Sequence, residues 1–302
     1  MYIGTPTVWN IALSTAKARG IPYRIPQFST VNEAINDPFV IPYLPTDLNR
    51  GMQVTDDYDF NTDSDLVKIA LFCIGNRGLT PVIGNGTMPP TNLPKPHAST
   101  DAALYGHVPF VIKPVTNDLT GADRHRFRLR RTIEIDGELY AAYYGRVVPP
   151  VTGDVELLVE LTLPGQATQT SVFTPTVNNL RLSDPDVSGN NTYTAVRANY
   201  PDTFEFTAQD VAWFEEACTL LYGDPSYARF SEIAICTGVD KLINGRYPNE
   251  GGAFQPLSSV YYETVGTQAY TFNNTEVVAY GTPGFSLNVD TGASERLFAR
   301  IE

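Results

Sequence analysis

Alternating apolar and polar residues predict a long β-hairpin near the middle of the chain. Two strand-like runs within residues 124–148 are separated by Asp136 and Gly137, a dipeptide that can adopt positive φ at both central positions of a type I′ turn. With a two-residue loop, Ile135 faces Glu138, and each further pair lies one residue outward on both strands. One face of the first strand then carries Phe127, Leu129, Ile133 and Ile135.

The opposite face of this hairpin is rich in arginine. It carries Arg126, Arg128 and Arg130, with Tyr143 on the second strand. Three interpretations are open: a solvated strand face, a contact between subunits, and a site for nucleic-acid phosphates. The formal charge of −12 disfavours the third, because an acidic body repels DNA. These four residues are therefore candidates for a protein interface.

Apolar spacing and capping residues predict three main helices. The first spans residues 6–19, with Thr5 as N-cap, Pro6 in the first turn and Gly20 at its end. Another spans residues 64–74. The strongest spans residues 208–222, capped by Thr207 and closed by Gly223. In the first helix, one face is expected to hold Val8, Ile11, Ala12 and Ala16.

Short strand-like runs and turn residues fill most of the remaining chain. They predict an α+β fold that is predominantly antiparallel β, with the long central hairpin, a C-terminal β-meander and about three amphipathic helices. We expect a helical and irregular region over residues 1–100 and a β-rich domain over 101–302 that contains the helix at 208–222. The predicted strands are 108–115, 155–163, 169–174, 192–198, 230–237, 259–264, 267–272, 275–280, 284–289 and 295–301.

Residues 81–98 contain five prolines and predict an extended segment without regular structure. One interpretation is an arm that grips a neighbouring subunit. The other is a rigid proline loop that lies on its own domain. If the segment is an arm, its candidate interface residues are Pro89, Pro90, Pro94 and Pro96.

Composition narrows the class of protein. With 42% hydrophobic and 18% charged residues, a disordered chain is excluded. Three cysteines in apolar contexts predict no disulfide and a reducing site of synthesis. We see neither a secretory signal at the N-terminus nor an apolar run long enough to span a bilayer, so we expect no membrane insertion. Nucleic-acid binding is disfavoured by the acidic balance.

The residues that could carry chemistry are few. Oxygen side chains at alternate positions resemble the start of a calcium loop, but Thr62 stands where that loop needs glycine and Lys68 where it needs glutamate. The three histidines lack metal-ligand spacing, and neither a nucleophile motif nor a phosphate-binding loop is present. We therefore predict no enzyme and no cofactor. The candidate calcium ligands are Asp57, Asp59, Asn61, Asp63 and Asp65.

Three stretches resemble the virion structural proteins of tailed bacteriophages. They are GIPYRIPQFSTVNE at residues 20–33, the block at 120–148, and SEIAICTGVDK at 231–241, together about a quarter of the chain. The resemblance implies a tail, neck or baseplate subunit that is made in the host bacterial cytoplasm and ends in the virion. Its partners would be other copies of itself and other virion proteins.

Two alternatives remain open from the sequence. One is a protein that decorates the capsid or joins it to the tail. The other is a receptor-binding or glycan-binding module, which would be favoured if the tyrosines of the C-terminal strands cluster around a pocket. Those tyrosines are Tyr261, Tyr262, Tyr270 and Tyr280.

Overall fold

The computed structural model confirms the α+β class and the predominance of antiparallel strands. It describes residues 2–3, 5–28, 54–59, 67–76, 97–100, 104, 107–148, 156–161, 167, 169–174, 177, 193–199, 201–248, 254–290 and 294–296. Residues 81–96 of the proline-rich segment lie outside these ranges, as do the calcium candidates Asn61, Asp63 and Asp65.

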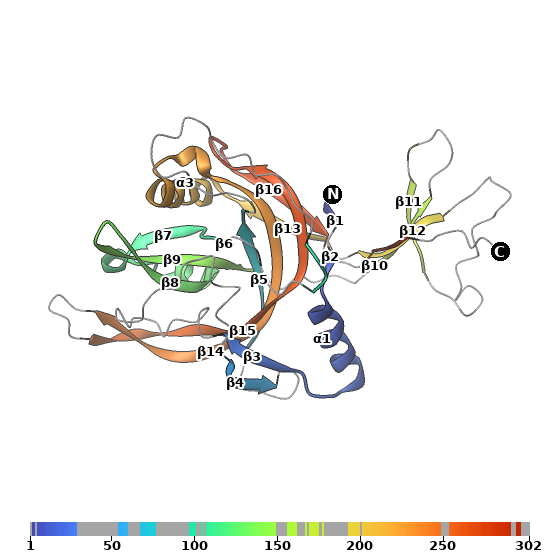
Figure 1. The fold of residues 1–302 in the computed structure, drawn as a ribbon, viewed down its shortest axis with the longest axis horizontal. Helices are drawn as coiled ribbons and strands as arrows, with labels where there is room; N and C mark the ends of the chain where they lie inside the picture. Colours follow the sequence, from blue (N-terminus) through green and yellow to red (C-terminus); the bar gives the residue numbers. More distant parts are fainter. Residues whose placement is uncertain are drawn as a thin grey trace.

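The largest sheet runs through the centre of the molecule (Figure 1). Its eight strands follow the order β2-β15-β14-β5-β9-β7, with β6 paired to β5 and β8 paired to β9. Every described pair in it is antiparallel. The strands are β2 (Thr5–Pro6), β5 (Val67–Gly75), β6 (His107–Val108), β7 (Val111–Pro114), β8 (Phe127–Ile135), β9 (Glu138–Val147), β14 (Arg229–Pro248) and β15 (Phe254–Val278).

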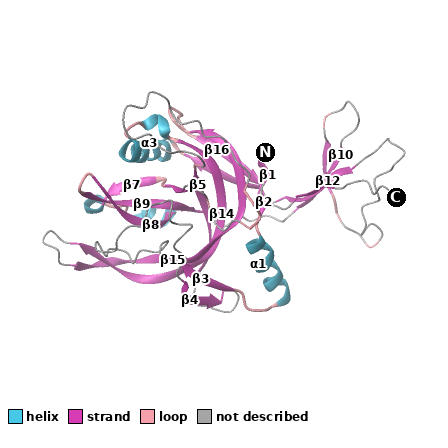
Figure 2. Cartoon of the chain, viewed as in Figure 1, coloured by secondary structure: helices cyan, strands magenta, loops and turns pink. Residues whose placement is uncertain are grey.

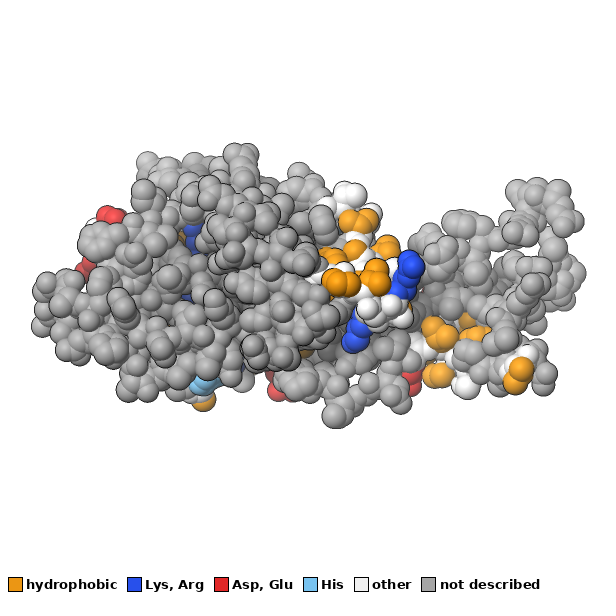
Figure 3. Space-filling model, turned by 90° about the horizontal axis from the view of Figure 1, so that it is seen from below, with side chains coloured by type: hydrophobic (Ala, Val, Ile, Leu, Met, Phe, Trp, Pro, Cys, Tyr) orange, Lys and Arg blue, Asp and Glu red, His pale blue; other side chains and the backbone are white. Residues whose placement is uncertain are grey.

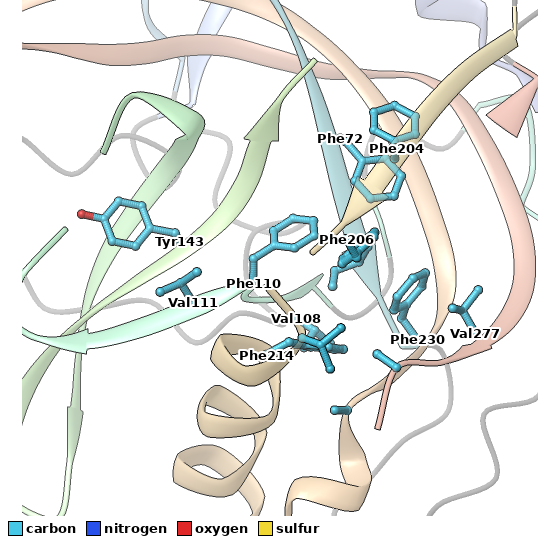
Figure 4. Close-up of a cluster of buried hydrophobic side chains, with 14 of the residues drawn as sticks. Phe72, Val108, Phe110, Val111, Tyr143, Phe204, Phe206, Phe214, Phe230 and Val277 are labelled. Atoms are coloured by element: carbon cyan, nitrogen blue, oxygen red, sulfur yellow. The ribbon is translucent and has the colours of Figure 1, made fainter. Parts of the chain in front are cut away.

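A second sheet and the longest helix enclose an aromatic core. The sheet has the order β1-β16-β13, and β1 is parallel to β16. The ring of Phe72 stacks on Phe204 with centroids 4.0 Å apart (Figure 4). Phe206 stacks on Phe285 with centroids 4.5 Å apart. Phe214 of the helix is fully buried in the same core. These elements are β1 (Tyr2–Ile3), β13 (Pro201–Phe206), β16 (Phe285–Asp290) and α3 (Ala208–Tyr222).

Two smaller sheets complete the described strands. A four-stranded sheet has the order β11-β10-β12-β17 and stands apart from the main body (Figure 2). A two-stranded sheet joins β3 to β4. The strands are β3 (Arg24–Phe28), β4 (Val54–Asp59), β10 (Glu156–Leu161), β11 (Gln169–Val172), β12 (Tyr193–Asn199) and β17 (Ser294–Arg296).

The central hairpin has the predicted register. Ile135 pairs with Glu138, and the pairing continues outward to Phe127 and Arg146. Asp136 and Gly137 have φ of 52° and 84°, as a type I′ turn requires. The predicted apolar face is wrong for Phe127, however. Leu129 adopts φ of 54° and interrupts the alternation, so Phe127 and Ile133 are buried in different cores.

β5 (Val67–Gly75) replaces the helix predicted over residues 64–74. Leu71 and Cys73 pack into one core, while Phe72 and Ile74 pack into the other. A strand buried on both faces needs no polar alternation, so its sequence is a continuous apolar run that also satisfies helical spacing. Pairing with β14, β9 and β6 decides the outcome.

The first helix, α1 (Val8–Arg19), begins later than predicted. Thr5 and Pro6 pair with β15, so the N-cap is Thr7, whose Oγ accepts a hydrogen bond from the Asn10 backbone. The buried face contains Leu13 and Ala16. Val8 and Ile11, which were expected on one face with Ala16, are exposed, whereas Ala16 is buried. Gly20 ends the helix at φ of 63°, as predicted.

α3 matches its prediction at both ends. Thr207 and Asp210 form a reciprocal capping box, and Gly223 closes the helix at φ of 79°. The other helical segments are short: η2 (Val115–Asn117), α2 (Gly121–Arg126) and η3 (Pro225–Tyr227). Of these, α2 occupies the start of the region predicted as the first hairpin strand.

The last strands differ in detail from the predicted meander. Three of its runs, at 259–264, 267–272 and 275–280, form or overlap one 25-residue strand, β15. It pairs antiparallel with the 20-residue β14. Gly266, between the first two of these runs, lies where the register shifts, between the pairs Val239–Val265 and Thr237–Gln268. Glycine at a β-bulge therefore gives the same sequence signal as glycine in a turn.

Candidate functional site

The arginines of the central hairpin were the leading interface candidates, and most of them lie inside the protein. Arg124 and Arg126 belong to α2, while Arg128 and Arg130 belong to β8. Arg128 and Arg130 are buried, as are Arg124 and Arg131. A buried guanidinium loses hydration and needs compensating charge or hydrogen bonds. The expected exposed arginine face is therefore wrong for Arg128 and Arg130.

Asp118 is the acceptor for one set of these buried groups. Its Oδ2 accepts from Nε of Arg130 at 2.8 Å, and its Oδ1 accepts from the Tyr143 hydroxyl at 2.6 Å. Arg124 lies over the Tyr143 ring at 5.0 Å. Burial raises the pKa of Tyr143, so the phenol stays protonated and donates to the carboxylate. Burial also lowers the pKa of Arg124.

Asp210 is the acceptor for a second set, at the N-terminus of α3. Its Oδ1 and Oδ2 accept from Nη2 of Arg126 at 2.7 and 3.0 Å. Nη1 of Arg146 on β9 lies 3.5 Å from Oδ2 of Asp210. The backbone N–H of Thr207 donates a hydrogen bond to the same oxygen. Burial lowers the pKa of Arg146, and the charge of Asp210 opposes that shift. One carboxylate thus caps α3 and binds both α2, through Arg126, and β9, through Arg146.

The contacts of Asp118 (the Asp118 set) and those of Asp210 (the Asp210 set) connect elements inside the protein. The Asp118 set joins the hairpin to the segment before α2, and the Asp210 set joins it to α3. The side chain of Arg126, with 35% of its surface exposed, is the one candidate of the arginine group that reaches solvent substantially. Buried Tyr143 and its arginine neighbours fix the hairpin in place; they do not present a recognition surface in this fold.

Two further sets of buried polar side chains were not predicted from the sequence. His97 and Glu232 lie with Nε2 and Oε1 3.6 Å apart, and both side chains are fully buried. His107 packs near Tyr144 with ring centroids 6.5 Å apart. Burial first, and the charge of Arg131 second, lower the pKa of His107 to about 4. These residues come from segments that are distant in the sequence, so no local spacing predicts their contacts.

The three cysteines are free and buried. Cys73 on β5 shares a hydrogen bond with Cys236 on β14, and this contact together with burial raises the pKa of the Cys73 thiol. Burial likewise raises the pKa of Cys218. Thiols held protonated in this way are poor nucleophiles.

Several predicted site residues fall outside the described part of the chain. Pro89, Pro90, Pro94 and Pro96 are among them, as are Asn61, Asp63 and Asp65. Asp57 and Asp59 lie in β4, but their side chains are not described. Among the described residues, no group of three or more histidine, cysteine or acidic side chains is placed to hold a metal. Of the four C-terminal tyrosines, only Tyr280 has a described side chain, and it is exposed.

The described surfaces that project from the body are made of strands. β14 pairs with β5 only from Glu232 to Asp240, yet it stays paired with β15 as far as Pro248 and Phe254. Beyond Asp240 the two strands therefore form a ribbon with no third described strand hydrogen-bonded to it. Figure 1 shows this ribbon extending along one side of the molecule and the β10–β12 sheet extending at another.

A protein-family model described as a family of unknown function (DUF7208) matches residues 2–302. No curated protein and no solved structure matches the chain. No helix in the described ranges is long and apolar enough to cross a membrane.

Proposed function

Since the chain belongs to DUF7208, a family of unknown function, we propose a function from its geometry: it is a structural subunit that binds neighbouring protein chains through projecting β-structure. The observation that carries this proposal is the β14–β15 ribbon. It pairs Lys241 with Glu263 and continues to the pair of Pro248 with Phe254. An isolated two-stranded ribbon is marginally stable in water, and its outer edges offer unpaired backbone donors and acceptors. A neighbouring chain that covers those edges would stabilise it.

The four-stranded sheet supports the same proposal. Its edge strand β11 (Gln169–Val172) is exposed along its whole length, and Val172 has 58% of its surface accessible. Leu158 and Val159 on the neighbouring β10 are buried, so the sheet has a packed interior and an open edge. Projecting sheets with open edges suit strand addition by a partner.

The assembly we propose is the virion of a tailed bacteriophage, with this chain in the tail, neck or baseplate. The support is the resemblance of residues 20–33, 120–148 and 231–241 to virion structural proteins. A capsid-decorating or head-tail joining protein would use the same kind of contact at another place in the particle. The partners are then copies of the chain and other virion proteins.

Shortening the ribbon tests the proposal. In the variant, residues 242–262 are replaced by Asn-Gly, which places a type I′ turn between the paired Lys241 and Glu263. The core residues of β14, from Phe230 to Cys236, are left intact. A matched control carries Gln209→Ala, an exposed change on α3.

Light scattering and chemical cross-linking would follow self-association and binding to other virion proteins. We expect the shortened variant to fold, as judged by circular dichroism, and to lose association, while the control keeps it. Wild-type protein that remains monomeric and binds no virion protein would contradict the proposal.

A further inference from the structure

α1 carries an apolar stripe that the described protein does not cover. Val8 and Ile11, three residues apart, are 38% and 60% exposed. Thr15 and Ala18 continue the stripe along the same side of the helix, and both are exposed. Ile21, just beyond the end of α1, is also exposed. Figure 3 shows the hydrophobic side chains gathered on this face beside basic ones.

The charge of this helix is opposite to that of the chain. Lys17 and Arg19 are exposed at its last turn, and no acidic residue occurs in α1. The whole chain has a net charge of −12. Basic residues at a helix C-terminus interact favourably with the negative end of the helix dipole, which accounts for the position of Lys17 and Arg19. The dipole does not account for the two exposed β-branched side chains in the first turn, Val8 and Ile11.

The turn between β8 and β9 carries charge of the opposite sign to that of α1, next to an exposed apolar side chain. Glu134, Asp136 and Glu138 are exposed around it. Leu139 is also exposed, with 38% of its surface accessible. Glu134, which pairs with Leu139 across the hairpin, places a carboxylate beside an apolar side chain at the tip, just as basic groups accompany the apolar stripe of α1.

We propose that α1 of one copy binds the β8–β9 turn of a second copy. Figure 1 shows the two elements on different sides of the molecule, so one chain cannot bring its own pair together. A contact between two different surfaces is heterologous, and repeated it yields a ring or a filament. This inference rests on the proposed function and assigns two of the surfaces that make the assembly.

The chemistry of the contact follows from the two surfaces. Leu139 packs against Val8 and Ile11, which removes apolar area from water. Lys17 and Arg19 meet the carboxylates at the rim, where they select the partner surface and speed its encounter. Because rim charges are screened by salt, the association weakens as the ionic strength rises.

Charge reversal tests the contact in the full chain. Lys17→Glu with Arg19→Glu alters the helix, and Glu134→Lys with Glu138→Lys alters the turn. Each pair should weaken self-association at least about tenfold in analytical ultracentrifugation. A variant with all four changes should associate about as tightly as wild type, because the two surfaces are complementary again. Gln209→Glu with Ser286→Glu, both exposed elsewhere, is the charge control.

Disulfide trapping gives a second readout. Copies with Ile11→Cys and copies with Leu139→Cys should form a mixed cross-linked dimer under mild oxidation, since the native cysteines are buried. If wild type associates but reversal leaves its association unchanged, or the fourfold variant is not restored, the inference is overturned and the proposed function stands. Wild type that never associates overturns both.

Discussion

Arg130 and Asp118 are joined inside the protein by a 2.8 Å hydrogen bond from Nε to Oδ2. Asp118 also accepts from Tyr143, so one carboxylate anchors both strands of the central hairpin. Breaking a buried ion pair by removing one partner leaves an uncompensated charge.

Asp118→Asn should therefore destabilise the protein by about 3 kcal/mol. The matched control is Asp136→Asn at the exposed turn, where asparagine also favours type I′ geometry and the change should stay below about 0.5 kcal/mol. Urea unfolding measures both. Equal effects of the two variants would show that the Asp118 network contributes nothing.

His107 should make stability depend on pH. Its folded pKa of about 4 lies below the ordinary value near 6.5, so between these values the unfolded chain binds a proton that the folded chain does not. Stability is then complete above about pH 6.5 and falls as the pH decreases toward 4, by about 3 kcal/mol in total.

The measurement is the urea midpoint from pH 4.5 to 7.5 in wild type and in His107→Gln. The substitution should flatten this part of the profile, whereas His125→Gln, at an exposed position on α2, should leave it unchanged. A wild-type slope that survives in His107→Gln would assign the effect to another group.

Thr207→Ala removes one half of the capping box of α3, because Oγ1 of Thr207 accepts from the Asp210 backbone. We expect a loss of about 1 kcal/mol in unfolding free energy. Gln209→Ala, exposed in the first turn of the same helix, serves as the control. Chemical denaturation monitored by circular dichroism would measure the unfolding free energy of both variants. Equal values would show that the Thr207 cap does not stabilise the helix.

Alanine substitutions at Gly284 and Gly281 distinguish the effect of a steric clash from the effect of backbone strain alone. Both have positive φ, at 115° and 72°, but a Cβ on Gly284 would lie 2.6 Å from the Phe206 carbonyl oxygen, while one on Gly281 would meet open space. Gly281→Ala should cost about 1 kcal/mol, and Gly284→Ala clearly more, about 3 kcal/mol. Thermal unfolding of both variants would compare them. A smaller loss in Gly284→Ala would contradict the described backbone contact.

The predictions that the structure confirms rest on residues that are close together in the sequence. Asp136 and Gly137 set the register of the hairpin, and Thr207, Asp210 and Gly223 set both ends of α3. In each case the residues that decide the structure are neighbours in sequence. The same holds for Gly20 at the end of α1.

Long-range contacts decided what the sequence left open. β5 is a strand because β14 and β9 flank it, although its spacing also fits a helix. Arg126 binds the N-terminus of α3 because Asp210, 84 residues later, accepts its hydrogen bond. His97 lies beside Glu232, which follows it by 135 residues in the chain. No pattern within one segment could have paired these groups.

The most direct test of the central claim is electron microscopy of intact particles from the organism that makes this chain. We predict many copies at one symmetric position in the tail, neck or baseplate, with the β14–β15 ribbon of each copy covered by a neighbouring chain. Particles without the chain, or a chain whose ribbon touches no neighbour, would contradict the account.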